Sequence, residues 1–401
     1  MSRVNTRARK VGSNVAAGAV SFYRRVTHSQ SSEFYQLLVV TLFLTGIGVL
    51  MVLSASFVDS MKQTNDAFSV FYRQGFVAIL GVVVMSIVSL FRVETFKKFA
   101  LQFALGSIVL QLLTVFTPLG VSVNGNRNWI LILGIRIQPS EFLKIAMILI
   151  VAAFIESKSR ELDDVKNTWL VPLVWGAVLF WGPVLAGKDV GTVIIMAFIM
   201  LGMAYLAGVP RLVWLGILGL AAVAVPVIMR SSESRWGRVM AWLNPDAPDP
   251  NDYNWQSEHG LWALAAGGIN GVGLGQSKLK WSWIPEAEND FIFAIIAEET
   301  GLLGALALII IIVYLAVVLV RISARTDTVF KKMIVLGVML WITMQSLVNI
   351  AVVLRLLPVL GVPLPLISAG GSSLLTILAA IGIVLAIERD NHLRLGSRRR
   401  R

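Results

Sequence analysis

Long apolar stretches, separated by short polar segments, run through most of this chain. Several of them approach or exceed the roughly 20 residues that an α-helix needs to cross a lipid bilayer. The pattern predicts ten spans, at residues 36–57, 74–91, 99–119, 139–155, 170–186, 190–207, 211–229, 290–321, 333–354 and 364–387. Ten-residue segments of alternating polarity, the mark of a membrane β-barrel, do not occur. We therefore expect an all-α, polytopic membrane protein with ten transmembrane helices.

The distribution of positive charge predicts which loops face the cytoplasm. Lys and Arg gather in the two tails, residues 1–35 and 389–401, and in loops such as Arg92–Lys98 and Arg321–Lys332. Positively charged loops stay on the cytoplasmic side, so both tails are expected there, close to anionic lipid. The outward loops are then residues 58–73, 120–138, 187–189, 230–289 and 355–363.

Composition narrows the chemistry. The chain is 56% hydrophobic and only 14% charged, against about 25% charged in soluble proteins. Its net charge of +12 reflects membrane topology, so we expect no nucleic-acid partner. Because there is no cysteine, and only His28, His259 and His392 are present, thiolate chemistry is excluded and a histidine metal site nearly so.

The longest outward loop, residues 230–289, separates seven predicted helices in 36–229 from three in 290–388. Within it, residues 256–266 predict a short helix lying on the membrane, followed by five glycines up to residue 275. The loop ends in a segment rich in tryptophan and carboxylates, Trp281–Asp290. Such side chains at a membrane surface indicate chemistry on a substrate held there.

Asp290 is the first candidate for that chemistry. An Asp directly before the apolar run at Phe291 suits a helix N-cap, and the same carboxylate could serve as a general base. Glu286 and Glu288 are nearby alternatives. Glu298 and Glu299 lie about two helical turns further along, on other faces of the helix, so we expect them to have a structural or supporting role.

Glu141 and Lys144 form a second candidate group, three residues apart and therefore on one face of the fourth predicted helix. They could form an internal ion pair that only aids packing. Alternatively, Lys144 binds an anionic ligand while Glu141 orients it. Arg136, just before this helix, favours the second interpretation, because the guanidinium group suits phosphate.

Three further residues lie in or beside outward loops. Asp189 occupies the hairpin between two short spans, where a solvated helix-end charge is the default, although short helices also mark ligand sites in membrane proteins. Arg127 and Trp283 fit interfacial anchors, and both are also candidates for substrate contact.

Pro363–Ser373 is the last signal. Two prolines and two glycines at the start of a span predict a broken or delayed helix, whose free backbone groups need partners. Amides and hydroxyls in such a segment, including Ser368 and Ser372, can bind phosphate.

These stretches together resemble the SEDS family, the shape, elongation, division and sporulation proteins that include FtsW and RodA. The resemblance covers about residues 36–388 and rests chiefly on Arg136–Lys144, Asp189–Thr192, Pro285–Ala294 and Pro363–Ser373. The sequences of Pro285–Ala294 and Leu364–Ser373 are closer to FtsW, the division member, than to RodA. The chain departs from the family where Glu288-Asn289 replaces His-Thr, Ala369 replaces Tyr, and Lys188 replaces Pro.

The resemblance implies a peptidoglycan glycosyltransferase in the bacterial plasma membrane, active at the division septum. It would polymerise lipid II, the undecaprenyl-diphosphate-linked disaccharide pentapeptide, beside a class B penicillin-binding protein and other divisome proteins. Asp290 would be the essential residue, with Glu141, Lys144, Asp189 and Ser372 in support. A divalent cation, Mg²⁺ or Mn²⁺, could assist at the diphosphate, although no metal ligand is certain.

Three other functions fit the same sequence. A flippase for lipid-linked sugar would use the spans and internal charges equally well. A RodA-like elongation polymerase would share the chemistry but not the septum. A scaffold that only recruits a transpeptidase would not need Asp290.

Overall fold

The computed structural model of the protein describes residues 30–123, 125–132, 135–158, 171–247, 249, 251–281, 283 and 285–399. The basic residues of the N-terminal tail before residue 30, the last two arginines and the loop 159–170 lie outside the described residues.

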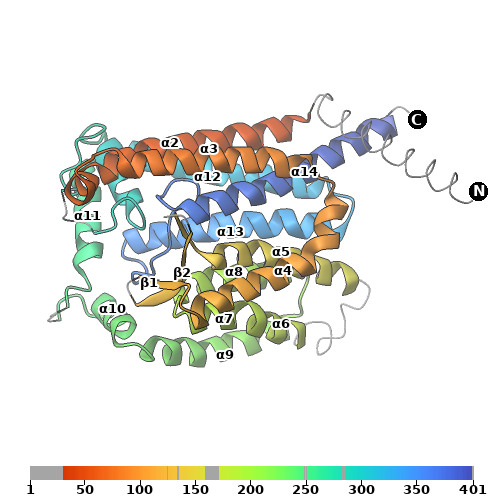
Figure 1. Ribbon diagram of the computed structural model, residues 1–401, viewed down its shortest axis with the longest axis horizontal. Helices are drawn as coiled ribbons and strands as arrows, with labels where there is room; N and C mark the ends of the chain where they lie inside the picture. The colour runs from red at the N-terminus through yellow and green to blue at the C-terminus, as the bar shows by residue number, and fades with distance from the viewer. Residues whose placement is uncertain are drawn as a thin grey trace, which may run out of the picture.

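The described chain is a bundle of helices that run side by side (Figure 1). The helices that correspond to predicted spans are α2 (Ser32–Thr64), α3 (Ser69–Leu90), α4 (Val93–Phe116), α5 (Pro139–Lys158), α6 (Val171–Gly176) with η2 (Ala177–Trp181) and α7 (Gly182–Ala186), α8 (Val190–Leu206), α9 (Arg211–Arg230), α12 (Ile292–Ala324), α13 (Val329–Val353) and α14 (Gly371–Arg399).

Length and composition allow a membrane crossing for seven of the described helices: α2, α3, α4, α9, α12, α13 and α14. The segments 173–186 and 190–206 are apolar but shorter. The protein is therefore an all-α, polytopic membrane protein, as predicted, while the count of ten spans stays a prediction. The fifth predicted span is not one regular helix, because the π-helical segment η2 interrupts it.

The eighth predicted span also differs from a single straight helix. Gly301 has φ 70° and ψ −171° inside α12, which breaks the helix after its first two turns. A Cβ at this position would lie 2.3 Å from the backbone nitrogen of Gly271 and 2.4 Å from the carbonyl oxygen of Ile269. Glycine is required here for both reasons, since it tolerates positive φ and admits the neighbouring backbone.

A three-stranded antiparallel sheet, absent from the prediction, occupies the loop 120–138, whose outward location stays a prediction. Its strands β1 (Gly120–Val123), β2 (Asn126–Ile132) and β3 (Ile135–Ile137) pair in the order β1-β2-β3. Val121 pairs with Trp129, and Leu131 pairs with Arg136. The backbone of Arg127 donates to the carbonyl of Gly187 at 2.9 Å, so β2 is attached to the turn between α7 and α8.

The large loop contains two helices, α10 (Glu233–Leu243) and α11 (Trp255–Gly267). The second confirms the short helix predicted at 256–266, and the first was not predicted. The helix α11 packs against the start of α12, where a Cβ at Gly267 would lie 2.2 Å from the carbonyl oxygen of Ala297. Its position on the membrane stays a prediction.

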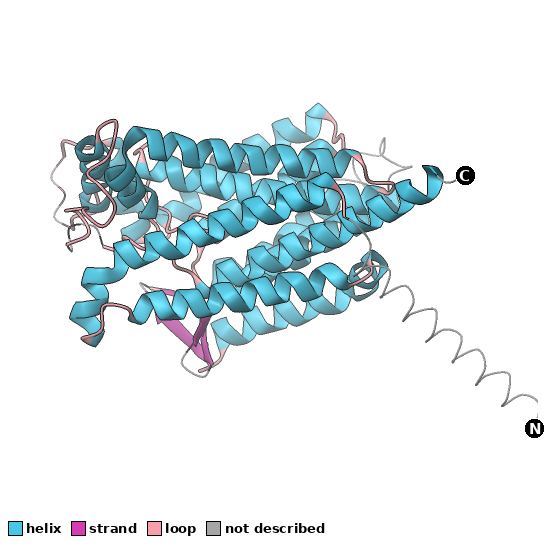
Figure 2. Cartoon of the chain, turned by 90° about the horizontal axis from the view of Figure 1, so that it is seen from above, coloured by secondary structure: helices cyan, strands magenta, loops and turns pink. Residues whose placement is uncertain are grey.

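The last span begins late, as predicted, since residues 357–370 are not helical and α14 starts at Gly371. Ser31 donates to Glu388 at 2.7 Å, which places the start of α2 beside the C-terminal part of α14. The start of α2 and the C-terminal part of α14 thus lie at one end of the bundle, and α10 and α11 lie at the other (Figure 1). Figure 2 shows the same bundle of helices from above.

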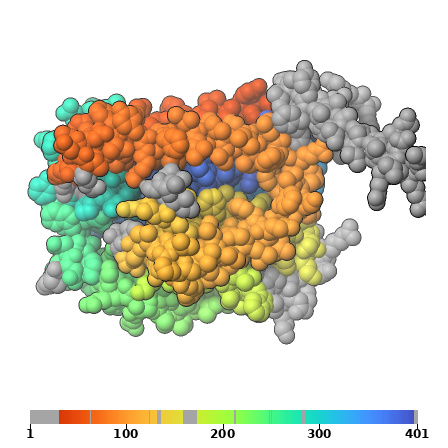
Figure 3. Space-filling view, in the orientation of Figure 1, coloured from red at the N-terminus to blue at the C-terminus, as the bar shows by residue number. Residues whose placement is uncertain are grey.

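The helices α13 and α14 lie deepest among the seven long apolar helices. About three-quarters of the residues in their apolar stretches are buried, in contrast to 11% in α9 at the periphery. Figure 3 shows part of α14 in blue between the orange surfaces of α3 and α4. The second half of the non-helical segment between α13 and α14, residues 362–368, is also largely buried, and polar side chains of α13 reach it there.

Candidate active site

The loop that carries Asp290 is held by its backbone. The carbonyl of residue 288 accepts from the backbone nitrogen of Ala369 at 2.8 Å, and the next carbonyl accepts from the hydroxyl of Ser368 at 2.6 Å. The carbonyl of Asp290 itself accepts from Nδ2 of Asn349 at 2.7 Å. Three consecutive carbonyls are thus fixed by α13 and by the segment before α14, and the backbone of the loop is held in one position.

The Asp290 side chain is not a helix cap, contrary to one of the two interpretations from sequence. Phe291 is the residue in the cap position of α12, and no side chain caps this helix. The carboxylate is half-buried and lies beside Gly361, where a Cβ would be 3.5 Å from Oδ2. It is therefore available for chemistry.

The surroundings of Asp290 raise the pKa of its carboxyl group to about 7. Burial is the main cause, because the charged form loses solvation. The negative charge of Glu286 adds to it, and those of Asp189 and Glu288 contribute less, whereas Arg238 on α10 opposes the shift. A carboxyl group with a pKa near 7 can accept a proton at physiological pH.

Asp189 forms a second acidic position at the start of α8. Its carboxylate caps the helix by accepting from the backbone nitrogen of Thr192 at 3.0 Å and from the Thr192 hydroxyl at 2.8 Å. Oδ2 also accepts from Nε2 of Gln138 at 2.9 Å. Burial raises the pKa of Asp189, while the bonds from Thr192 and the charge of Lys144 oppose the rise.

Glu141 and Lys144 form the ion pair that their spacing predicted. Lys144 Nζ lies 2.7 Å from Glu141 Oε1, and both side chains are almost completely buried. The ammonium group also donates to Gln345 Oε1 at 3.2 Å and lies 4.7 Å from the centre of the Trp341 ring. While this pair is intact, Lys144 has no exposed face for a ligand, and it acts on the site through its charge.

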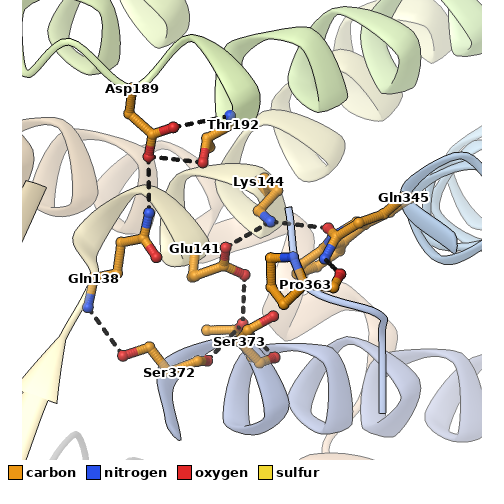
Figure 4. A network of polar contacts seen from close by, with 11 residues as sticks. Gln138, Glu141, Lys144, Asp189, Thr192, Gln345, Pro363, Ser372 and Ser373 are labelled. Atoms are coloured by element: carbon orange, nitrogen blue, oxygen red, sulfur yellow. Dashed lines mark hydrogen bonds and ion pairs between the residues drawn. The ribbon is translucent and has the colours of Figure 1, made fainter. Parts of the chain in front are cut away.

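Ser372, at the start of α14, connects the region of Glu141 and Lys144 to β3 (Figure 4). Its hydroxyl accepts from the backbone nitrogen of Gln138 at 2.9 Å and lies 3.3 Å from the carbonyl oxygen of Arg136. One turn later, the Thr376 hydroxyl lies 3.4 Å from Glu141 Oε2. The first turn of α14 thus fixes the end of β3 and the start of α5 together.

Asp189 and Asp290 both lie close to the segment 360–362. A Cβ at Gly191 would lie 2.4 Å from the carbonyl oxygen of Leu360, so the start of α8 touches this segment closely. Asp290 lies beside Gly361 of the same segment. The charge of Glu141 acts on Asp189, and that of Asp189 acts on Asp290, so the three carboxylates belong to one polar region of the bundle.

Arg127 and Trp283 do not join this network through any contact among the described residues. Arg127 donates to the carbonyl of Thr117 at 2.7 Å. Trp283 stacks on Trp255 with ring centroids 6.1 Å apart, and its carbonyl accepts from the indole of Trp255 at 2.7 Å. The exposed Arg136 side chain has no ion-pair partner within the described ranges.

Glu298 and Glu299 lie before the break at Gly301 and bind the glycine-rich loop. Glu298 accepts from the hydroxyl of Ser277 and from the backbone nitrogen of Lys278. Glu299 lies 3.5 Å from Lys280 Nζ and accepts from a serine of α2, Ser54. Glu286 is exposed and accepts from the side chain of Asn289.

Four residues of this region were missed from the sequence: Gln138, Arg238, Gln345 and Asn349. Gln345 and Asn349 lie four residues apart in an otherwise apolar stretch of α13, and that spacing was a usable signal for one polar helix face. Arg238 belongs to the unpredicted helix α10, so its approach to Asp290 depends on the tertiary fold.

A cation would find few protein ligands here. No group of three or more His, Cys, Asp or Glu side chains that could hold a metal ion occurs in the part of the chain that the structure describes. A divalent ion would therefore depend on one or two carboxylates and on oxygens of its substrate, which is the coordination that Mg²⁺ commonly accepts.

The fold and the site define an integral membrane protein with an acidic centre at one end of the bundle. Residues 35–393 match the cell cycle protein family of FtsW, RodA and SpoVE, and the chain belongs to that family.

Named relatives cover most of the chain. It is 36% identical over 353 residues to the probable peptidoglycan glycosyltransferase FtsW of Mycobacterium tuberculosis, covering 88% of this chain and 67% of the relative. It is 33% identical over 368 residues to the stage V sporulation protein E of Bacillus subtilis, covering 91% of this chain and 99% of the relative. The predicted resemblance to the SEDS family is thereby confirmed.

Solved structures share the fold. A chain of a peptidoglycan synthase complex, studied for the coordination of polymerization and crosslinking, superimposes with a TM-score of 0.73 at 23% identity, covering 89% of this chain and 98% of the other. The rod shape determining protein RodA of Thermus thermophilus gives a TM-score of 0.67 at 21% identity, covering 91% and 99%.

Proposed function

We propose that this protein is a peptidoglycan glycosyltransferase that polymerises lipid II into glycan strands, with Asp290 as the general base. The observation that carries the proposal is the half-buried carboxylate of Asp290, with a pKa of about 7, on a loop in which three consecutive carbonyls are held by hydrogen bonds. The names of the relatives support the same activity.

The reaction joins the 4-hydroxyl of one sugar to the anomeric carbon of another. Asp290 removes the proton of the hydroxyl as its oxygen attacks, the bond to the diphosphate breaks, and the lipid diphosphate leaves with the electron pair. The anomeric configuration inverts in this single displacement, from α to β. A diphosphate is a weak base, so the leaving group needs positive charge rather than a protonating acid, unlike the two-carboxylate arrangement of glycosidases.

Two cationic side chains suit the diphosphate. Arg136 is the exposed middle residue of β3, and Arg238 acts on Asp290 from α10. A guanidinium group can bind phosphate oxygens through two hydrogen bonds at once. Lys144, Asp189 and Ser372 then organise the region behind them, and a Mg²⁺ or Mn²⁺ ion that uses phosphate oxygens would add positive charge.

The cellular setting is part of the same proposal. Relatives named FtsW favour a role in division, at the septum, with other divisome proteins and a class B penicillin-binding protein as partners. The superposition with a chain of a peptidoglycan synthase complex is consistent with such a partner. Both termini lie in the cytoplasm in this proposal, because the basic tails flank the first and last helices.

Purified protein in detergent, supplied with lipid II, tests the activity. There is no membrane to cross under these conditions, so a flippase would leave lipid II unchanged, whereas the polymerase makes strands that a muramidase digests. The assay is run alone and with a class B penicillin-binding protein. Unchanged lipid II in both cases contradicts the proposal.

A further inference from the structure

Two side-chain amides stand out in the interior of the bundle. Gln345 and Asn349 lie one turn apart on α13, each 1% exposed. Residues four apart share a helix face, so both amides point to the same side. Neither residue is charged, yet each contacts a charged residue of the site: Gln345 contacts Lys144, and Asn349 contacts Asp290.

Asn349 holds two backbone carbonyls with one amide group. Nδ2 donates to the carbonyl oxygen of Asp290 at 2.7 Å and to that of Val362 at 2.8 Å. Both neighbours are acceptors only, so the NH2 group must face them, and the orientation of the amide is fixed by its partners. This side chain ties the loop of Asp290 to the segment beside Gly361.

Gln345 performs the matching function one turn away. Nε2 donates to the carbonyl of Pro363 at 2.8 Å, while Oε1 accepts from Lys144 at 3.2 Å and from the indole of Trp341 at 2.8 Å. Figure 4 shows Gln345 beside Pro363. Because Asn349 holds the carbonyl of Val362, the adjacent carbonyls of residues 362 and 363 are held by adjacent turns of one helix. Each amide links this shared segment to a different charged residue.

We infer that Gln345 and Asn349 are positioning residues for the reaction: Asn349 holds the backbone of Asp290 so that its carboxylate stays beside Gly361, and Gln345 fixes the ammonium group of Lys144. The inference rests on the proposed function. The carboxylate must lie within hydrogen-bond reach of the sugar hydroxyl, and an error of about 1 Å in such a group can lower the rate about 100-fold.

The two positions predict different kinetic defects. Asn349→Leu removes the donor while keeping a similar volume, so kcat for glycan formation should fall about 10- to 100-fold with little change in KM. The released loop should also let water reach Asp290, which lowers the pH midpoint of the rate. Gln345→Met removes one of the two acceptors of Lys144 and leaves its ion pair with Glu141. Because Lys144 organises the region behind the proposed diphosphate site, this variant should mainly raise the KM for lipid II, with the pH midpoint unchanged.

Ser346→Ala is the matched control. Ser346 lies between the two residues in the sequence and is also buried, and its hydroxyl donates to the Ile342 carbonyl of its own helix. This variant should retain wild-type kcat and pH midpoint. Folded protein is measured for every variant by size-exclusion chromatography in detergent, and Asn349→Ala, which also removes the donor without adding a charge, provides a second variant if Asn349→Leu does not fold.

The outcomes separate this inference from the proposed function. Folded Asn349 variants with a low kcat and a shifted midpoint support it. Wild-type kcat and midpoint in the folded variants overturn it, and so does a loss of rate that only follows the folded fraction. If Asp290→Asn is inactive while Asn349→Leu is normal, the positioning role alone fails. If Asp290→Asn is fully active, the proposed function fails.

Discussion

Glycan formation by this protein should depend on pH through the ionisation of Asp290. The carboxyl group has a pKa of about 7, raised by burial and by neighbouring acids. A general base works in its ionised form, and a raised pKa means that this form disappears as the pH falls through 7. With that pKa, about one eleventh of the molecules carry the ionised base at pH 6 and about ten elevenths at pH 8, so kcat should rise about tenfold across this range.

An ordinary aspartate predicts a different result. A carboxyl group with a pKa near 3.9 stays more than about 99% ionised from pH 6 to pH 8, and its rate would be flat. The assay measures initial rates of strand formation at saturating lipid II, in detergent and at constant ionic strength, from pH 5 to pH 8.5. Each sample is returned to pH 7.5 afterwards to exclude irreversible inactivation.

Two substitutions should move the midpoint in opposite directions. The charge of Glu286 raises the pKa of Asp290, and that of Arg238 lowers it. Glu286→Gln should therefore move the midpoint to lower pH, and Arg238→Gln should move it to higher pH. A flat rate between pH 6 and pH 8, or shifts of the same sign in both variants, would refute the reasoning.

Two further predictions concern the scaffold around the site. Gly301→Ala should destabilise the protein by about 1–3 kcal/mol or more, because it forces a side chain into positive φ and against the backbone of residues 269–271. Gly216 has open space around it, so the control Gly216→Ala should cause no such loss. Thermal unfolding of both variants in detergent tests this. Lys280→Met leaves the buried Glu299 carboxylate without its cation and should lower the free energy of unfolding by about 3 kcal/mol. Adding Glu299→Gln should recover part of that loss, and a double variant as unstable as the single one would contradict an ion-pair role.

The helices were predictable because apolar length is a local property of the sequence. Each predicted span corresponds to a helical segment among the described residues, although some boundaries are displaced by more than a turn, most of all in the last helix, which was predicted at 364–387 and lies at Gly371–Arg399. The break at Gly301 was not predictable, since an isolated glycine is tolerated in a helix and its positive φ depends on contact with residues 269–271. The sheet at 120–137 was missed because its strands have only four, seven and three residues.

The site was predictable where charge marks a residue in an apolar chain. Glu141 and Lys144 form the pair that a three-residue spacing indicates, and Asp189 lies at a helix end. The contribution of Arg238 was not predictable, because it is 52 residues before Asp290 and only the fold brings them together. Asn349 carries no charge, and its partners are backbone carbonyls that have no signature in the sequence.

The most direct test of the account is the activity of Asp290→Asn. The substitution keeps the shape of the side chain and removes the base, whose contribution is on the order of 10²–10⁴ in rate. Purified variant and wild type are compared at equal amounts of folded, membrane-extracted protein, with lipid II and a class B penicillin-binding protein present. The account predicts no measurable glycan strands from the variant; strands formed at the wild-type rate would contradict it.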